Sequence, residues 1–324
     1  MSKQQVEMVR IGTRGSTLAR TQTGWVADRL RSLGVVVEVE TISTQGDARV
    51  DVPVSRIGGD GVFVRELEQA LLDGRVDAAV HSLKDLPTAV TPGLSLACVP
   101  ERATPFDALV AGPGASLAGL RSGAVVGTSS IRRVAQTRAL RPDLDVRPIR
   151  GNVDSRLRRF DAGEFDALIL AAAGLERLGL VGRISELLRP PAFWPAVAQG
   201  ALVVQIRAAD QRLHDILAPL DHASTHAAVL AERSCLAGLA GGCLAPIGAW
   251  ARLQDDGCVV LGACVLEDEG GRVRRIVAEQ QAGARIAEVS SAAFRQLGAD
   301  VAAGLLADGA ADMLARMRAQ AERE

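Results

Sequence analysis

The stretch MVRIGTRGSTLAR, residues 8–20, decides the fold class because it leads from a strand almost directly into a helix. Residues 8–13 have the composition of a buried strand. Ser16 is of a type that caps helix N-termini, and helical spacing continues from it to about Arg31. A strand joined to a helix by so short a turn indicates the start of an α/β fold.

The same alternation continues through the first two hundred residues. Strands are predicted over 35–43, 77–82 and 94–99, and a helix over 63–74 ends on Gly74. A second series starts near Pro105, with strands over 107–110, 124–128, 146–149, 165–171 and 199–208 and helices from Ser130 and over 152–163. Strands separated by helices indicate parallel sheets covered on both faces. We therefore expect two α/β domains facing each other, with ligands at the carboxyl ends of the strands.

The pattern changes near Ser224. A helix over 224–239 leads into glycines, and alternating segments over 247–254, 258–267 and 273–281 predict an antiparallel meander before an alanine-rich closing helix. The predicted division is an α/β domain of residues 1–103 plus 200–220, a second α/β domain of residues 104–199, and a small α+β domain of residues 221–324.

The bulk composition excludes several classes of protein. The 324 residues carry a net charge of −1, so no overall charge draws the chain to nucleic acid or to an anionic membrane. No apolar run is long enough to span a bilayer, and the first residues have no signal-peptide core. Five cysteines without a CxxC pair argue against a disulfide framework and against a zinc site. We expect a cytoplasmic, soluble monomer that binds no metal, nucleic acid or membrane.

Arginines gather where predicted strands end. Helix N-termini attract anions, and guanidinium groups bind carboxylates through forked hydrogen bonds. An arginine-rich chain can also carry solvated arginines on its helices, but their position after four strands favours a cleft for a ligand with several carboxylates or phosphates. The residues concerned are Arg14, Arg132, Arg133, Arg150, Arg156 and Arg177.

Two further positions carry side chains suited to chemistry. Lys84 and Asp85 follow a predicted strand, and an aspartate among arginines stays ionised and can exchange a proton with a cationic nitrogen. The alternative is a local cap or a loop salt bridge, and His81 is interpreted as a core histidine. Cys243 lies in a glycine-rich turn, which suits covalent attachment, although no histidine stands in a recognisable relation to it.

Several motifs together resemble those of the hydroxymethylbilane synthase (porphobilinogen deaminase) family. In order along the chain they are IGTRGSTLA, RIGGDGVFVRELEQALL, AVHSLKDLPT, VGTSSIRR, IRGNVDSRL, LILAAAGLERLGL, AVAQGALVVQIR and GGCLAPIGA. The resemblance implies two α/β domains similar to transferrins and periplasmic binding proteins, followed by a small α+β domain. It also implies the condensation of four porphobilinogen molecules with loss of ammonia, then hydrolytic release of linear hydroxymethylbilane. The residues alone leave open a non-catalytic two-lobed binding protein for a small polycarboxylate.

The resemblance also implies roles for individual residues. Cys243 would carry a dipyrromethane cofactor through a thioether bond, Asp85 would be the catalytic group, and Lys84 would lie beside it in the site. The six arginines named above would bind the acetate and propionate groups of cofactor and substrate. The supporting positions are Ser16, Ser82, Thr128, Ser129, Ser130, Asn152 and Gln199.

Overall fold

The computed structural model describes residues 8–43, 64–239, 245–286 and 290–321. The chain forms two compact units, residues 1–102 with 201–226, and residues 103–200 with 227–324. No helix in these described ranges is both long and apolar enough to cross a membrane.

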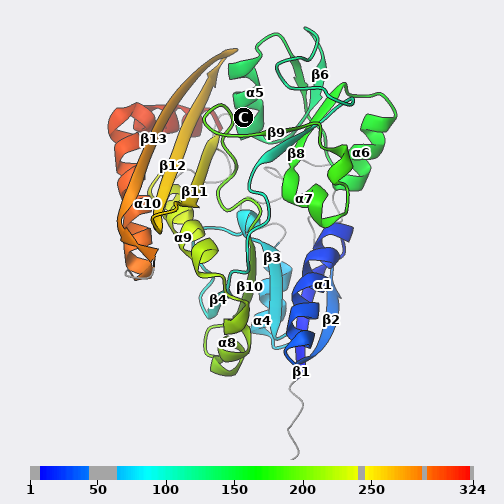
Figure 1. The fold of residues 1–324 in the computed structure, drawn as a ribbon, viewed down its shortest axis with the longest axis vertical. Helices are drawn as coiled ribbons and strands as arrows, with labels where there is room; N and C mark the ends of the chain where they lie inside the picture. The colour runs from blue at the N-terminus through cyan, green and yellow to red at the C-terminus, as the bar shows by residue number, and fades with distance from the viewer. Residues whose placement is uncertain (1–7, 44–63, 240–244, 287–289, 322–324) are drawn as a thin grey trace, which may run out of the picture. The chain divides into compact units, whose positions relative to one another are not determined.

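The first unit contains a five-stranded sheet in the order β2-β1-β3-β10-β4 (Figure 1). Its strands are β1 (Met8–Arg14), β2 (Val36–Ile42), β3 (Ala78–Ser82), β4 (Leu94–Cys98) and β10 (Leu202–Arg207). The first three are mutually parallel, whereas β10 runs antiparallel to both of its neighbours. The helices are α1 (Thr17–Ser32), α4 (Arg65–Leu72) and α8 (Gln211–Leu217).

Alternation along β3 explains why this sheet is covered on both faces. Ala78 and Val80 belong to one buried cluster together with Leu30 of α1, whereas Ala79 belongs to a second cluster with Leu67 of α4. Successive side chains of a strand point to opposite faces, so a strand with apolar residues throughout requires cover on both sides. The predicted two-sided cover is confirmed for this sheet.

The second unit contains a sheet of the same pattern, in the order β7-β6-β8-β5-β9. Its strands are β5 (Asp107–Val110), β6 (Val125–Gly127), β7 (Asp145–Arg147), β8 (Ala167–Ala171) and β9 (Glu186–Leu188). The helices α5 (Ile131–Leu140), α6 (Val153–Asp161) and α7 (Ala172–Arg177) follow β6, β7 and β8. Here β5 is the antiparallel strand, paired with both β8 and β9.

The prediction of purely parallel sheets is therefore wrong, because each sheet contains one strand, β10 or β5, that runs against neighbours on both sides. A fully buried strand has the same apolar composition whichever way it runs, so the residue pattern carries no information on its direction. The α/β class itself is confirmed.

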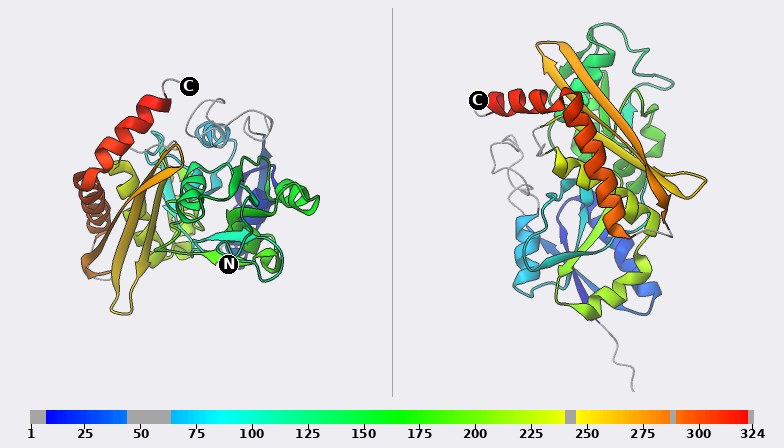
Figure 2. Two further views of the ribbon diagram at one scale, coloured as in Figure 1. Left: turned by 90° about the horizontal axis from the view of Figure 1, so that it is seen from above. Right: turned by 90° about the vertical axis from the view of Figure 1, so that its left-hand side faces the viewer.

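The second unit also holds the predicted antiparallel meander. Strands β11 (Ile247–Leu253), β12 (Cys258–Glu269) and β13 (Arg272–Arg285) pair in sequence order. Helix α9 (Ala223–Gly238) precedes them, and α10 (Ser291–Leu305) packs along β12 and β13 (Figure 2). The predicted single closing helix is in fact two, because Gly309 has a φ of 105° and separates α10 from α11 (Ala311–Ala321).

The two sheets of the second unit are joined by contacts from α5. Ala135 of α5 shares a buried cluster with Cys264 and Leu266 of β12, and Trp194 completes it. Arg138 of α5 adds an ion pair with Asp268 of β12, with 2.5 Å between Nη1 and Oδ2. The helix that begins in the SSIRR motif thus contacts the third sheet directly.

Two glycines of the second unit, Gly200 and Gly163, differ in how closely other atoms approach them. Gly200 has a φ of 87°, and a Cβ there would lie 2.5 Å from the carbonyl oxygen of Ala103, whereas Gly163 has a φ of 78° and open space around it. Gly163→Ala should cost about 1 kcal/mol, the cost of left-handed backbone, and Gly200→Ala about 3 kcal/mol because overlap is added. Chemical denaturation measures both. Equal losses would contradict this packing.

Candidate functional site

In the second unit, the ends of three strands bring functional side chains to one edge of the sheet. Strands β6 and β8 run parallel and end at Gly127 and Ala171. Because β5 runs the other way, its first residue, Asp107, pairs with Ala171 at that same edge. The start of α5 and the start of α7 therefore lie beside the carboxylate of Asp107.

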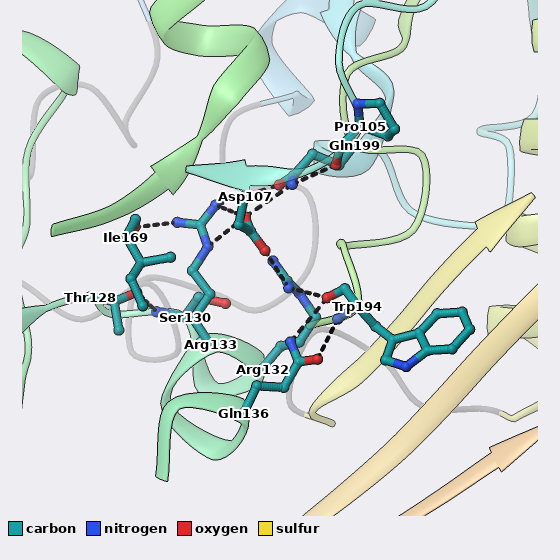
Figure 3. A network of polar contacts seen from close by, with 10 residues as sticks. All are labelled: Pro105, Asp107, Thr128, Ser130, Arg132, Arg133, Gln136, Ile169, Trp194 and Gln199. Atoms are coloured by element: carbon teal, nitrogen blue, oxygen red, sulfur yellow. Dashed lines mark hydrogen bonds and ion pairs between the residues drawn. The ribbon is translucent and has the colours of Figure 1, made fainter. Parts of the chain in front are cut away.

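Asp107 binds both arginines of the SSIRR motif (Figure 3). Its Oδ2 lies 2.7 Å from Nη1 of Arg132, and its Oδ1 lies 2.7 Å from Nη2 of Arg133 and accepts a hydrogen bond from Nε at 2.9 Å. The exposed fractions are 0% for Asp107, 4% for Arg132 and 7% for Arg133. Two guanidinium groups and one carboxylate thus share a site that is almost closed to water.

The protonation state of this group follows from its neighbours. Burial alone would raise the pKa of Asp107, but the charges of Arg132 and Arg133 and their hydrogen bonds hold that pKa well below its ordinary value. Burial lowers the pKa of Arg133, while Asp107 opposes that shift. The carboxylate therefore stays ionised at neutral pH and fixes the direction of both guanidinium planes.

Gln199 brings a third side chain to Asp107. Its Nε2 donates to Oδ1 of Asp107 at 3.0 Å and to the carbonyl oxygen of Pro105 at 2.8 Å. Both flanking residues have left-handed backbone, with φ of 57° at Ala198 and 87° at Gly200. A non-glycine residue rarely adopts that conformation, so local strain accompanies the placement of Gln199.

Arg177 lies at the end of α7 and is held by the same turn. Its Nη2 donates to the carbonyl oxygen of Gly200 at 2.7 Å. Burial lowers the pKa of this guanidinium to about 10, with Glu176 opposing the shift. The structure thus brings Arg132, Arg133, Arg177 and Gln199 together around one edge.

Gln136 and Trp194 complete the far side of the network. Oε1 of Gln136 accepts from the backbone N–H of Trp194, and Nε2 of Gln136 donates to the Trp194 carbonyl oxygen at 3.0 Å. The same oxygen accepts a hydrogen bond from Nη1 of Arg132. Sequence reasoning did not identify Asp107, Gln136 or Trp194. A charged residue opening the apolar strand DALV is a signal that could have identified Asp107.

The ends of β6 and β7 carry a second group of arginines. Ser129 joins these ends, since its Oγ donates to the carbonyl oxygen of Ile149 at 2.8 Å and accepts from the Ile149 N–H at 3.0 Å. Arg150 follows directly. Asn152 caps α6, with its Oδ1 accepting from the N–H of Ser155 at 2.9 Å, and Nε of Arg156 donates to the Gly151 carbonyl oxygen.

The pKa of Arg156 depends on the positive charges of its neighbours. Burial lowers its pKa to about 10, and the positive charges of Arg133 and Arg150 lower it further. Three cations that repel one another in a partly buried place favour an anion with several charged oxygens. Thr128 and Ser130 lie next to them at the start of α5, and the Ser130 N–H donates to Oγ1 of Thr128.

The remaining described candidates belong to the first unit. Arg14 ends β1, and Ser16 caps α1 as predicted, with Oγ accepting from the Ala19 N–H at 3.3 Å. Lys84 and Asp85 are exposed on a one-turn 3₁₀ helix, Leu83–Asp85, directly after β3. Cys243 lies outside the described residues.

Three contacts hold the turn that carries Asp85. Oγ of Ser82 lies 3.0 Å from Nε2 of Gln22, a buried polar residue of α1. The N–H of Leu83 donates to the carbonyl oxygen of Ala201 at 3.0 Å, and the Leu83 side chain is buried. The exposed carboxylate of Asp85 thus stands on a fixed backbone. Gln22 is a further residue that sequence reasoning did not identify.

His81 lies inside β3, buried close to this turn. Burial lowers the pKa of its imidazole to about 4, Arg14 adds to the shift, and the side chain of Gln205 opposes it. The ring is therefore neutral at pH 7. This agrees with the interpretation of His81 as a core histidine.

Comparison with known families gives two matches. The model described as "Porphobilinogen deaminase, dipyromethane cofactor binding domain" matches residues 9–215, and "Porphobilinogen deaminase, C-terminal domain" matches residues 226–307. Together the two matches cover both units.

Curated relatives carry the same name. The porphobilinogen deaminase of Nitratidesulfovibrio vulgaris strain Miyazaki F is 47% identical over 318 residues, which is 96% of this chain and 98% of that relative. The one from Roseiflexus sp. strain RS-1 is 51% identical over 84% of this chain and 89% of its own length. The porphobilinogen deaminase of Mycolicibacterium gilvum is 48% identical over 95% of this chain and 98% of its own length.

The solved structures that match this chain are more distant. A nutrient binding protein from Burkholderia cenocepacia bound to methionine has a TM-score of 0.41 at 14% identity, covering 65% of this chain and 90% of its own. A putative lipoprotein from Actinomyces odontolyticus has a TM-score of 0.40, also at 14% identity, with the same coverage.

The lowered pKa of His81 makes stability depend on pH. The unfolded chain binds a proton near pH 6.5 and the folded chain only near pH 4, so stability falls as the pH drops through this window. Relative to His81→Gln, the wild-type chain should lose about 3 kcal/mol between pH 7 and pH 4. Urea unfolding at pH 7, 5.5 and 4 measures the difference. Two curves that stay parallel would exclude a buried neutral histidine.

Proposed function

Because this chain belongs to the porphobilinogen deaminase family, we propose that it joins four porphobilinogen molecules head to tail and releases linear hydroxymethylbilane by hydrolysis. It is then a transferase of tetrapyrrole biosynthesis, the pathway class that yields haem and porphyrins. The observation that carries the proposal is the group of arginines in the second unit, in which Asp107 fixes the buried Arg132 and Arg133. Each porphobilinogen brings two carboxylates, so a lengthening chain needs many guanidinium partners.

The residues of the second unit fit a covalently held dipyrromethane cofactor. Arg133, Arg150 and Arg156 lie close enough to depress the pKa of Arg156, and a polycarboxylate would relieve that repulsion. When bound, the dipyrromethane supplies the free pyrrole carbon to which the first unit is added, and each later unit joins the ring added before it. We also assign Arg14, Arg132 and Arg177 to carboxylate binding. Supporting positions in the binding of cofactor and substrate are assigned to Ser16, Ser82, Thr128, Ser129, Ser130, Asn152 and Gln199.

Cys243 is assigned as the attachment residue. Three of the other cysteines, Cys98, Cys235 and Cys264, are buried, and burial raises the pKa of each thiol to about 12. A thiol of so high a pKa contributes almost no thiolate at neutral pH and is a poor nucleophile. The position of Cys243 in the GGC motif, four residues before β11, supports its role as the thioether ligand.

Asp85 is assigned as the catalytic group. Each addition breaks the C–N bond of an aminomethyl group, releases ammonia, forms a C–C bond and removes one proton from a pyrrole carbon. A carboxylate on a fixed, exposed turn stabilises the positive charge that develops on the pyrrole nitrogen and accepts the proton. Lys84 beside it provides a compact cation for a substrate carboxylate.

The wider organisation is proposed on the same basis. We place the protein in the cytoplasm as a monomer. We divide it into an α/β domain of residues 1–103 plus 200–220, a second of residues 104–199, and a third domain of residues 221–324 that carries the cofactor cysteine.

The intact mass of the purified chain tests the proposed function. We expect wild-type protein to exceed its sequence mass by two linked pyrrole units, with the added mass on the peptide that contains Cys243. Cys243→Ser should purify at its sequence mass and be inactive. Wild-type protein that stays at its sequence mass after incubation with porphobilinogen would instead favour a non-catalytic polycarboxylate-binding protein.

The role of Asp85 is tested by Asp85→Asn. The variant should carry its cofactor and keep its stability within about 0.5 kcal/mol, because the residue is exposed. Its kcat should fall by roughly 100-fold or more, since proton transfer loses its base. Asp28→Asn, which removes another exposed carboxylate of the first unit, is the control and should leave kcat unchanged. Full activity of Asp85→Asn would overturn the assignment.

A further inference from the structure

The segment that contains Trp194 contacts both sheets of the second unit. On one side, the Trp194 carbonyl oxygen accepts hydrogen bonds from Arg132 and Gln136 of α5 (Figure 3). On the other side, the Pro195 carbonyl oxygen accepts from the Ala249 N–H of β11 at 3.0 Å. Arg275 of β13 donates to the carbonyl oxygens of Pro191 and Ala192. The segment therefore joins the arginine network to the third sheet.

The indole of Trp194 occupies a space that is open because two neighbouring residues, Gly248 and Gly262, have no side chain. A Cβ at Gly262 of β12 would lie 2.4 Å from Cη2 of Trp194, and a Cβ at Gly248 of β11 would lie 2.6 Å from its Cβ. Neither glycine has a positive φ, so backbone conformation does not explain them. At both positions the atom closest to such a Cβ belongs to Trp194, so a larger residue there would first collide with Trp194.

Shape rather than hydrogen bonding holds the indole there. Trp194 is 3% exposed, and its Nε1 has no hydrogen-bond partner among the described residues. An unpaired buried N–H is unfavourable, so a phenylalanine ring would be expected if only apolar packing mattered. The longer indole reaches across both glycines and into the cluster with Ala135 and Cys264.

We propose that Trp194 is a positioning residue that fixes the Asp107-bound arginine pair relative to β11, the strand that begins four residues after Cys243. The inference rests on the proposed function, since its consequence concerns the loading of the cofactor. Arg132 and Gln136 share the carbonyl oxygen of the residue whose side chain is held by β11 and β12. A shift of the third sheet is thereby transmitted to the arginines. Removing the indole from the space beside Gly248 and Gly262 uncouples the arginines from that sheet.

The experiment compares Trp194→Ala with Phe193→Ala. Both residues are buried aromatics and neighbours in sequence, but Phe193 packs in the core of the second sheet with Leu109 and Ile169. Each variant is expressed as cofactor-free chain and incubated with porphobilinogen at a fixed interval below its own Tm. The gain of two pyrrole units is followed by intact mass. Trp194→Ala should load at least ten-fold more slowly than wild type, and Phe193→Ala within two-fold.

Three further variants keep the test decisive if Trp194→Ala does not fold. Gly262→Ala displaces the indole from the other side and should show the same slow loading, whereas Gly283→Ala in β13, with open space around its Cβ, should load normally. Trp194→Phe should restore loading to within about three-fold of wild type, because the phenyl ring still fills most of the space beside Gly248 and Gly262.

The outcomes separate the two proposals. Equal loading rates for Trp194→Ala and Phe193→Ala, or for Gly262→Ala and Gly283→Ala, would overturn the positioning role and leave the proposed function intact. A wild-type chain that never gains mass would overturn the proposed function itself.

Discussion

The carboxylate of Asp107 has no exposed surface, yet it binds two guanidinium groups and the amide of Gln199. Moving three charges out of water costs several kcal/mol per ion unless each is paired and hydrogen-bonded. Each carboxylate oxygen of Asp107 binds one of the two arginines. Removing Asp107 would therefore leave two buried cations without this compensation. The conformation of α5, the 198–200 turn and the Trp194 segment all depend on this one ion.

The arginines around this ion link the fold to the chemistry. Among the described residues, Asp107 pairs with Arg132 and Arg133, while Arg150 and Arg156 bring further positive charge from the ends of neighbouring elements. Guanidinium groups bind carboxylates brought in from outside through forked hydrogen bonds. A pyrrole chain bearing acetate and propionate groups supplies them at regular intervals, and the rigid backbone of the strand ends sets their spacing.

Much of this could be predicted from the sequence, because strands, helices and caps are determined locally. Ser16 capping α1, Gly74 after α4 and the antiparallel β11–β13 meander follow from residue type and period. Strand direction could not be predicted, since a buried strand has the same composition either way. Asp107, Gln136 and Trp194 also escaped prediction, because their partners lie 25, 58 and 62 residues away. Motif resemblance identified the arginines but not the carboxylate that orients them.

The most direct test of the central claim is a crystal structure of the cofactor-bearing chain. We expect carboxylates of the bound pyrroles within hydrogen-bond distance of Arg133, Arg150 and Arg156, with Asp107 still paired to both Arg132 and Arg133. The Trp194 carbonyl oxygen should still accept from Arg132. Pyrrole carboxylates bound away from these arginines, or an Asp107 that has left the arginine pair, would contradict the account.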